Sequence, residues 1–292
     1  MSQSFQSPLR NNLPYSLGRF DFQLSSAWQL AGRMQKFYRL TVWNKAFEDG
    51  TNARQIWNNQ IEELKNNAAT QSGDSYVREV SLPEELVGVW CLASPKYYPR
   101  DVNLIAMKKL ADHVLFLKAE ASMGREAIAE EVLTEVSKGY VPGSPQGFSI
   151  GLGAFVMKPS IDEHANAGFR YPGGAEITIN TDTVTEPETE VPDSQYQAMA
   201  NFLGEKGSKL DVLSKQHRDI AGFSGVERRV QFQENGKPAQ LMYTWMYPGQ
   251  PVNGLRPSVR IKGIAPAAQS DILNQAWDLI LGTIKLRNND LR

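Results

Sequence analysis

The chain has 292 residues, 41% of them hydrophobic and 22% charged, which is the ordinary composition of a globular protein with a packed core. Its 31 Lys and Arg residues balance 32 Asp and Glu residues, so the net charge gives no electrostatic reason to expect binding to nucleic acid or to an acidic membrane. No window approaches the roughly 18 uninterrupted apolar residues that a membrane-spanning helix needs. At about 150 residues per domain, the length predicts two domains.

The first half of the chain begins with strand-like alternation and ends with a helical pattern. Phe20, Phe22 and Leu24 alternate with polar residues and predict one buried strand face. Asn52 stands directly before a helical stripe and predicts its N-cap. In chain order we expect strands over 17–25 and 36–43, a helix over 53–67, strands over 75–80 and 85–93, a hairpin over 102–120 that turns near Ala111 and Asp112, and a helix from Gly124 to about Gly139.

The second half repeats this order of elements. Residues 162–168 and 214–222 read as loops, and Glu227–Phe232 places two arginines on a strand, where we expect one of them to face solvent. In chain order we expect strands over 148–158 and 175–183, a helix from about Ser194 to Glu205, strands over 210–215, 225–233, 238–247 and 258–265, and a closing helix that starts near Ala267.

Short echoes between the halves indicate an internal duplication, for example Leu17-Gly18 and Leu152-Gly153. The sequence therefore predicts an α+β fold of two similar domains, each a largely antiparallel sheet with two helices. The Pro- and Gly-rich stretch 141–147 has the composition of a linker. This boundary gives an N-terminal domain over 1–142 and a C-terminal domain over 147–292.

Two segments are candidates for contact with another protein. Asp182–Ser194 carries acids and two prolines without apolar periodicity, and is either a solvated connection or a recognition loop. Lys96–Arg100 combines tyrosines with cations, and is either an ordinary amphipathic turn or a binding anchor. The candidate partner-binding residues are Tyr97, Tyr98, Arg100, Asp182, Glu186, Glu188, Glu190 and Asp193.

One motif suggests catalysis. Gly147–Gly151 fits G-x-S-x-G, in which Ser149 would be the nucleophile of a serine hydrolase. That role needs a strand before the serine and a helix directly after it, whereas a linker precedes Ser149 and a strand pattern follows it. The histidines lack the spacing of a metal pair. We therefore expect a binding protein and not an enzyme, without a metal or cofactor; the alternatives are a hydrolase using Ser149 and a duplicated scaffold that binds a small ligand.

The single cysteine, Cys91, lies in an apolar run and cannot form an internal disulfide, which fits a reducing compartment. Its surroundings favour a packed core thiol over a reactive one. The chain as given starts without the apolar segment of a signal peptide, so we expect a cytoplasmic location.

Four stretches, in the order in which they occur, resemble a known family: residues 17–43, 147–169, 213–227 and 241–263. They are similar to the opening, the start of the second domain, a further characteristic stretch and the final strands of the immunity proteins that neutralise type VI secretion phospholipase effectors. No single stretch is highly specific, but the succession is.

The resemblance implies two α+β domains arranged as a clamp that holds a toxin inactive. It implies that the chain binds and inhibits a cognate secreted lipase or phospholipase effector, which protects the producing bacterium and its kin. Such immunity proteins are usually periplasmic, which is the alternative to a cytoplasmic location. Protein inhibitors of enzymes typically bury about 1,600 Å² of surface at the interface. We expect the segments Asp182–Ser194 and Lys96–Arg100 to contribute contacts to that interface.

Overall fold

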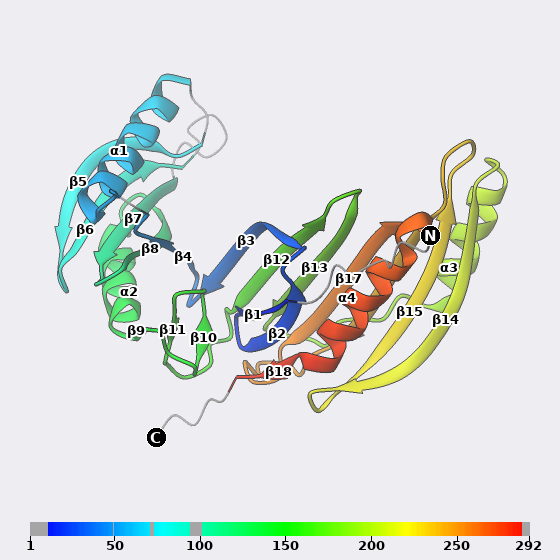
Figure 1. Cartoon of the computed structure of the whole chain (residues 1–292). Coiled ribbons are helices and arrows are strands. Elements are labelled where there is room, and N and C mark those ends of the chain that lie inside the picture. Colours follow the sequence, from blue (N-terminus) through cyan, green and yellow to red (C-terminus); the bar gives the residue numbers. More distant parts are fainter. Residues whose placement is uncertain (1–10, 49, 71–72, 94–100, 288–292) are drawn as a thin grey trace, which may run out of the picture. The chain divides into compact units, whose positions relative to one another are not determined.

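The computed structural model describes residues 11–287 apart from 49, 71–72 and 94–100. This part of the chain is an α+β structure with large antiparallel sheets and four α-helices (Figure 1). None of the described helices is long and apolar enough to cross a membrane. The chain divides into two compact units: unit 1 contains the residues up to Arg33 together with Pro159–Arg287, and unit 2 contains Met34–Lys158.

Unit 1 is built on an antiparallel sheet in the order β14-β15-β16-β17-β13-β12. A hairpin, β1–β2, and the short strand β18 form a second, three-stranded sheet. The elements are β1 (Asn12–Leu17), β2 (Phe20–Ser25), the start of β3 (Gln29–Phe37), β12 (His164–Tyr171), β13 (Ala175–Asp182), α3 (Asp193–Gly204), β14 (Lys209–Ile220), β15 (Phe223–Gln233), β16 (Gln240–Tyr247), β17 (Ser258–Pro266), the 3₁₀ turn Ala267–Gln269, α4 (Ser270–Thr283) and β18 (Lys285–Leu286).

Unit 2 is built on a sheet in the order β5-β6-β7-β8-β4-β3, into which β3 continues from unit 1. A hairpin, β10–β11, and the short strand β9 form its second sheet. The elements are β4 (Leu40–Ala46), α1 (Ala53–Thr70), β5 (Ser75–Leu82), β6 (Leu86–Leu92), β7 (Asp101–Lys109), β8 (His113–Ser122), α2 (Glu126–Lys138), β9 (Tyr140–Pro142), β10 (Phe148–Ser149) and β11 (Gly153–Phe155).

The two large sheets have the same connectivity: two strands, a helix, four strands and a helix follow one another in chain order. Each small sheet joins a hairpin to a single short strand. The hairpin β1–β2 precedes the first set of elements but pairs with β18, the strand after α4, through Phe20 and Leu286. The hairpin β10–β11 precedes the second set but pairs with β9, the strand after α2, through Phe155 and Tyr140. Each unit therefore receives its hairpin from the segment that precedes the other set.

This exchange makes the compact units differ from the predicted domains. Residues up to Arg33 belong with the C-terminal part of the chain, and residues 141–158 belong with the N-terminal part. The expected linker 141–147 connects β9 to β10 within unit 2. The physical reason is backbone pairing between strands that are distant in sequence, which a Pro/Gly-rich composition does not reveal.

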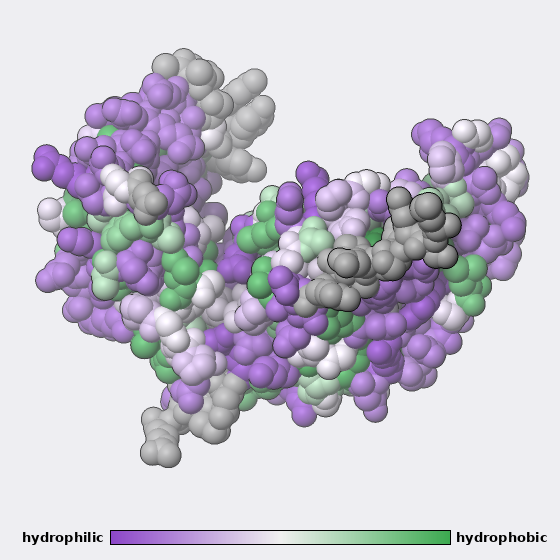
Figure 2. Space-filling model, in the orientation of Figure 1, coloured by the Kyte–Doolittle hydropathy of each residue, from purple (hydrophilic) through white to green (hydrophobic). Residues whose placement is uncertain are grey.

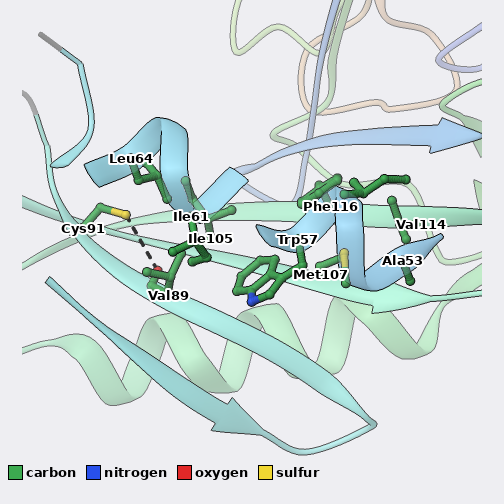
Figure 3. Close-up of a cluster of buried hydrophobic side chains, with 11 residues drawn as sticks. Ala53, Trp57, Ile61, Leu64, Val89, Cys91, Ile105, Met107, Val114 and Phe116 are labelled. Carbon is green, nitrogen blue, oxygen red and sulfur yellow. Dashed lines mark hydrogen bonds between the residues drawn. The ribbon is translucent and has the colours of Figure 1, made fainter. Parts of the chain in front are cut away.

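The core of unit 2 lies between α1 and its sheet (Figure 3). Asn52 caps α1 as predicted: its Oδ1 accepts a hydrogen bond from the Gln55 N–H at 3.1 Å, and Gln55 Oε1 accepts one from the Asn52 N–H at 3.0 Å. The predicted stripe is buried and includes Trp57, Ile61 and Leu64. Each such side chain contributes about 1.5–3 kcal/mol when it leaves water. These residues pack with Ala53, Ile56, Val89, Cys91, Ile105, Met107, Val114 and Phe116.

The core of unit 1 lies under α4, which is red in Figure 1 and packs on β17 and β2. Leu273, Trp277 and Ile280 are fully buried on this helix. Gly263 of β17 allows the close approach, because a Cβ atom there would lie 2.7 Å from Leu273 Cδ1.

Several predicted elements are confirmed, and four are wrong: two expected strands and two expected loops. The strand expected over 36–43 is a hairpin between β3 and β4, because Tyr38 and Arg39 adopt positive φ angles of 51° and 66° without the glycine that usually marks such a turn. The strand expected over 148–158 is the hairpin β10–β11, with Gly151 at φ 109°.

The two expected loops are also strands. Residues 162–168 overlap β12, in which Ala165 and Ala167 face the core, and alanine is a weak strand signal. Residues 214–222 overlap β14, whose side chains are almost all exposed or half-buried, so that no apolar alternation marks it. Both strands are held by backbone pairing, β12 with β13 and β14 with β15.

Candidate functional site

Ser149 does not have the geometry of a nucleophile. Its side chain is buried in β10, with 1% of the residue exposed, and its hydroxyl accepts a hydrogen bond from the Gly151 N–H at 3.2 Å. The chain continues into β11 and not into a helix, so the turn lacks the helix N-terminus that would stabilise an oxyanion. The carbonyl of Ser149 accepts a hydrogen bond from Gln35 Nε2, which ties β10 to β3.

The buried histidine, His113, links two strands. Its Nδ1 lies 2.5 Å from Asp112 Oδ1, and its Nε2 lies 2.8 Å from the hydroxyl of Tyr140. That hydroxyl also accepts a hydrogen bond from Asn44 at 3.3 Å. Burial raises the pKa of Tyr140 to about 12, so the phenol stays neutral at ordinary pH and the set of side chains joins β8 to β9.

Burial in a different part of unit 2 makes Cys91 unreactive. It lies in the α1 core, and burial raises the pKa of its thiol to about 12, so that little thiolate forms near neutral pH. Across the described residues, His, Cys, Asp and Glu side chains form no group of three or more that could hold a metal ion.

The structure places four of the five predicted acidic residues in bonds within the chain. Asp182 contacts Nδ1 of His164. Glu188 accepts hydrogen bonds from Arg260 at 2.7 Å and from Ser258 at 3.1 Å. Glu190 and Asp193 share the cations Arg228 and Lys215, at distances between 2.6 and 3.1 Å. The fifth, Glu186, is exposed. Most of these carboxylates therefore position the segment 182–194 and do not form a free acidic surface.

Arg228 is the centre of this arrangement, although the sequence indicated only that one of the two arginines would face solvent. It is 4% exposed, and its guanidinium lies 3.9 Å from the ring centre of Tyr196 on α3. Its neighbour Arg229 is half-buried and bonds Glu227, so both arginines are used inside the fold. The hydrogen bond from Lys215, with the nearby charge of Arg228, lowers the pKa of Asp193 and keeps it ionised. The beginning of α3 is therefore held by charges.

The rest of α3 is held much more loosely. This helix follows β13 and precedes β14, as α1 follows β4 and precedes β5, yet it buries no side chain completely. A cavity of about 490 Å³ lies between α3 and β14, lined by Tyr196, Ala200, Leu210, Val212 and polar neighbours. In unit 2, α1 covers one face of the sheet. In unit 1, α3 covers the corresponding face only in part.

Apolar side chains are exposed on α3 and β14, the two elements that flank this cavity. Met199 and Phe202 of α3 are 44% and 55% exposed. On β14 a β-bulge interrupts the register between Val212 and Ser214, which leaves Leu213 unpaired and 53% exposed. Figure 2 shows green apolar surface among purple at the right-hand edge, where Figure 1 places α3 and β14. We call Met199, Phe202, Val212 and Leu213 the α3 surface; apolar patches of this kind mark protein-binding sites.

No direct sequence signal marks the α3 surface, because the apolar residues of α3 follow the same spacing as a buried stripe. Tyr97, Tyr98 and Arg100, the other predicted contact residues, lie outside the described residues. Their described neighbours in the chain are Ala93 and Asp101.

Comparison with known proteins adds to this geometry. A model of the C-terminal domain of Tle cognate immunity protein 4 matches residues 141–289, slightly more than half of the chain. It begins within the stretch 141–147. No curated protein matches the sequence.

Solved structures share the fold over nearly the whole chain. The apo structure of the immunity protein TplEi of the T6SS from Pseudomonas aeruginosa is 17% identical with a TM-score of 0.70, over 94% of this chain and 97% of that chain. The crystal structure of a Tle4–Tli4 complex contains a chain that is 17% identical with a TM-score of 0.71, over 96% of this chain and 98% of that one. TplEi with a bound "L" peptide is 16% identical with a TM-score of 0.69, over 96% and 99%.

Proposed function

Because the chain belongs to the Tle cognate immunity protein 4 family, we propose that it is an immunity protein that binds and inhibits a cognate type VI secretion lipase effector. In this role it protects the producing bacterium and its kin. The observation that carries the proposal is the family match over residues 141–289. The similarity of fold to the Tle4–Tli4 complex supports it, since that structure contains an immunity protein together with its effector.

The chain acts in this proposal by binding and not by catalysis. The burial of Ser149 and the strand that follows it support this view, because the G-x-S-x-G motif is then part of the β10–β11 hairpin. The high pKa values of Cys91 and Tyr140 support it as well, because neither side chain is activated as a nucleophile.

We also propose that the two sets of elements arose by internal duplication, with the clamp arrangement that the resemblance implies. The shared connectivity of the two large sheets supports the duplication. A second feature supports it independently: the outermost strands β5 and β14 each carry a β-bulge, and the bulges leave Val77 and Leu213 exposed at corresponding places.

The α3 surface is the part of unit 1 that we assign to effector binding. Its charged neighbours Glu190 and Asp193 pair with Arg228, and the side chains exposed on this surface are apolar. Interfaces of protein inhibitors depend on a few apolar or aromatic anchors of this type. Of the predicted acids, Glu186 is available as a contact, and the other four serve to hold the segment in place.

Replacing Phe202 with aspartate is expected to weaken effector binding by at least about tenfold, or 1.4 kcal/mol, because it places a charge in an apolar contact. Isothermal titration calorimetry with the purified effector measures the change. The matched control is Ile128→Asp, since Ile128 of α2 is 58% exposed and Phe202 is 55% exposed. Equal affinity of the Phe202 variant and the control would remove the α3 surface from the interface.

A further inference from the structure

A polar cavity lies in unit 2, on the same sheet face as the α1 core. Ile105 and Met107 of β7 contact α1, and Asp101 and Asn103 precede them at the same alternate positions. Phe116 of β8 belongs to the same core, and Lys118, Glu120 and Ser122 follow it on that face. These polar residues, together with Asp74, line a cavity of about 590 Å³. The face that is apolar under α1 therefore becomes a polar hollow farther along the same strands.

Among the described residues that line this hollow, acidic side chains outnumber basic ones. Asp74, Asp101 and Glu120 carry carboxylates, and Lys118 is the one cation in this described set. Lys118 Nζ lies 2.6 Å from Asp74 Oδ2 and neutralises that carboxylate. Asp101 and Glu120 remain as acceptors, and Glu120 pairs directly across the strands with Asn103.

Asn103 gives an independent sign that a donor is missing. The residue is 3% exposed, and its Nδ2 donates a hydrogen bond to Asp74 Oδ1 at 2.7 Å. This bond fixes the orientation of the amide, because an ionised carboxylate can only accept. The other amide atom, Oδ1, is then a buried acceptor without a donor among the described residues. Leaving such a buried acceptor unpaired is unfavourable, because the oxygen has lost its hydrogen bonds to water.

We propose that this cavity receives an arginine side chain of the effector. A guanidinium carries five N–H donors in a planar fork, so it can serve Asn103 Oδ1 and the carboxylates of Glu120 and Asp101 together. An ammonium group is a compact point charge and matches acceptors spread over two strands less well. The inference rests on the proposed function.

The test combines Asp101→Asn and Glu120→Gln in one chain and measures effector binding by calorimetry at low and physiological salt. The expected result is a dissociation constant at least about tenfold higher, with a weaker dependence on salt, because a charged contact is lost. The matched control is Glu62→Gln with Glu63→Gln, which removes the same charge from exposed positions of α1 in the same unit. Its affinity is expected to equal that of the unmodified chain.

Each outcome has a distinct meaning. If the cavity variant and the control bind equally well, the cavity inference is overturned while the proposed function stands. If the unmodified chain does not bind the effector, both are overturned. Replacing effector arginines one at a time by methionine identifies the occupant: the correct replacement weakens binding to the unmodified chain and causes no further loss with the cavity variant.

Discussion

Replacing Glu227 with alanine is expected to lower the free energy of unfolding by about 3–5 kcal/mol, the usual result of removing one partner from a buried ionic network. Glu227 is 1% exposed. Its carboxylate accepts hydrogen bonds from Arg218 and Arg229, each at 2.9 Å, and from the indole N–H of Trp277 at 3.0 Å. Gln216 adds a fourth at 3.1 Å. The alanine variant leaves two guanidinium groups and an indole without their acceptor at the junction of β15 and α4.

Urea denaturation measures this loss. Glu234→Ala is the control, because Glu234 forms only an exposed pair with Lys237 at 2.8 Å and exposed pairs contribute less than about 1 kcal/mol. If the two variants lose the same stability, Glu227 is not the anchor of α4.

The same residue predicts a dependence on pH. Burial alone would raise the pKa of Glu227, but the hydrogen bonds from Arg218, Arg229, Gln216 and Trp277 outweigh it and hold the pKa below its usual value of 4.5. A lowered pKa in the folded state means that the unfolded state binds the proton more readily. The stabilisation by Glu227 is therefore complete above pH 4.5 and is lost as the pH falls through the lower, folded-state pKa. Glu227→Gln is expected to remove this part of the acid sensitivity, and an unchanged slope between pH 5 and 3 would contradict it.

A fragment of residues 34–158 is expected to fold by itself, whereas a fragment of residues 1–142 is expected to remain unfolded. The reason is the exchange of hairpins. Phe155 of β11 stacks on Phe37 with ring centres 4.7 Å apart, and Phe148 of β10 lies 5.0 Å from the same ring. Fragment 1–142 lacks both partners, and the loss of a buried phenylalanine costs about 3–5 kcal/mol. Two such losses consume most of the roughly 5–15 kcal/mol by which a domain is stable.

Circular dichroism with thermal unfolding distinguishes the two fragments. A single cooperative transition is expected for 34–158 and none for 1–142. Cooperative unfolding of 1–142 with the stability of 34–158 would contradict the exchange and would favour a division near residue 142.

Sequence patterns predicted those parts of the fold that depend on local chemistry. The stripe of Trp57, Ile61 and Leu64, the cap at Asn52 and the hairpin near Ala111 all follow from neighbours within a few positions. The repeated order of strands and helices was also visible, because each element carries its own periodicity. The turn at Tyr38 was missed, since its positive φ angles are not accompanied by glycine.

Features that depend on distant partners could not be predicted in the same way. The pairing of β2 with β18 joins residues near the two ends of the chain, and no local pattern specifies it. The acidic residues at 188–193 were predicted to bind a partner because they are charged. Their actual partners, Arg228 and Arg260, lie far along the sequence. A residue type shows that a charge exists, and only the fold shows whether that charge is already satisfied. The same limit applies to Asn103, whose unpaired acceptor becomes apparent only from its neighbours.

The proposed function is that this chain inhibits a lipase effector by binding to it. The most direct test is to measure the lipase activity of the purified cognate effector as increasing amounts of the chain are added. We expect hydrolysis to fall in proportion to the added chain and to stop when the two proteins are equimolar, because inhibitors of this class dissociate slowly. Undiminished hydrolysis in the presence of a saturating excess of the chain would contradict the account.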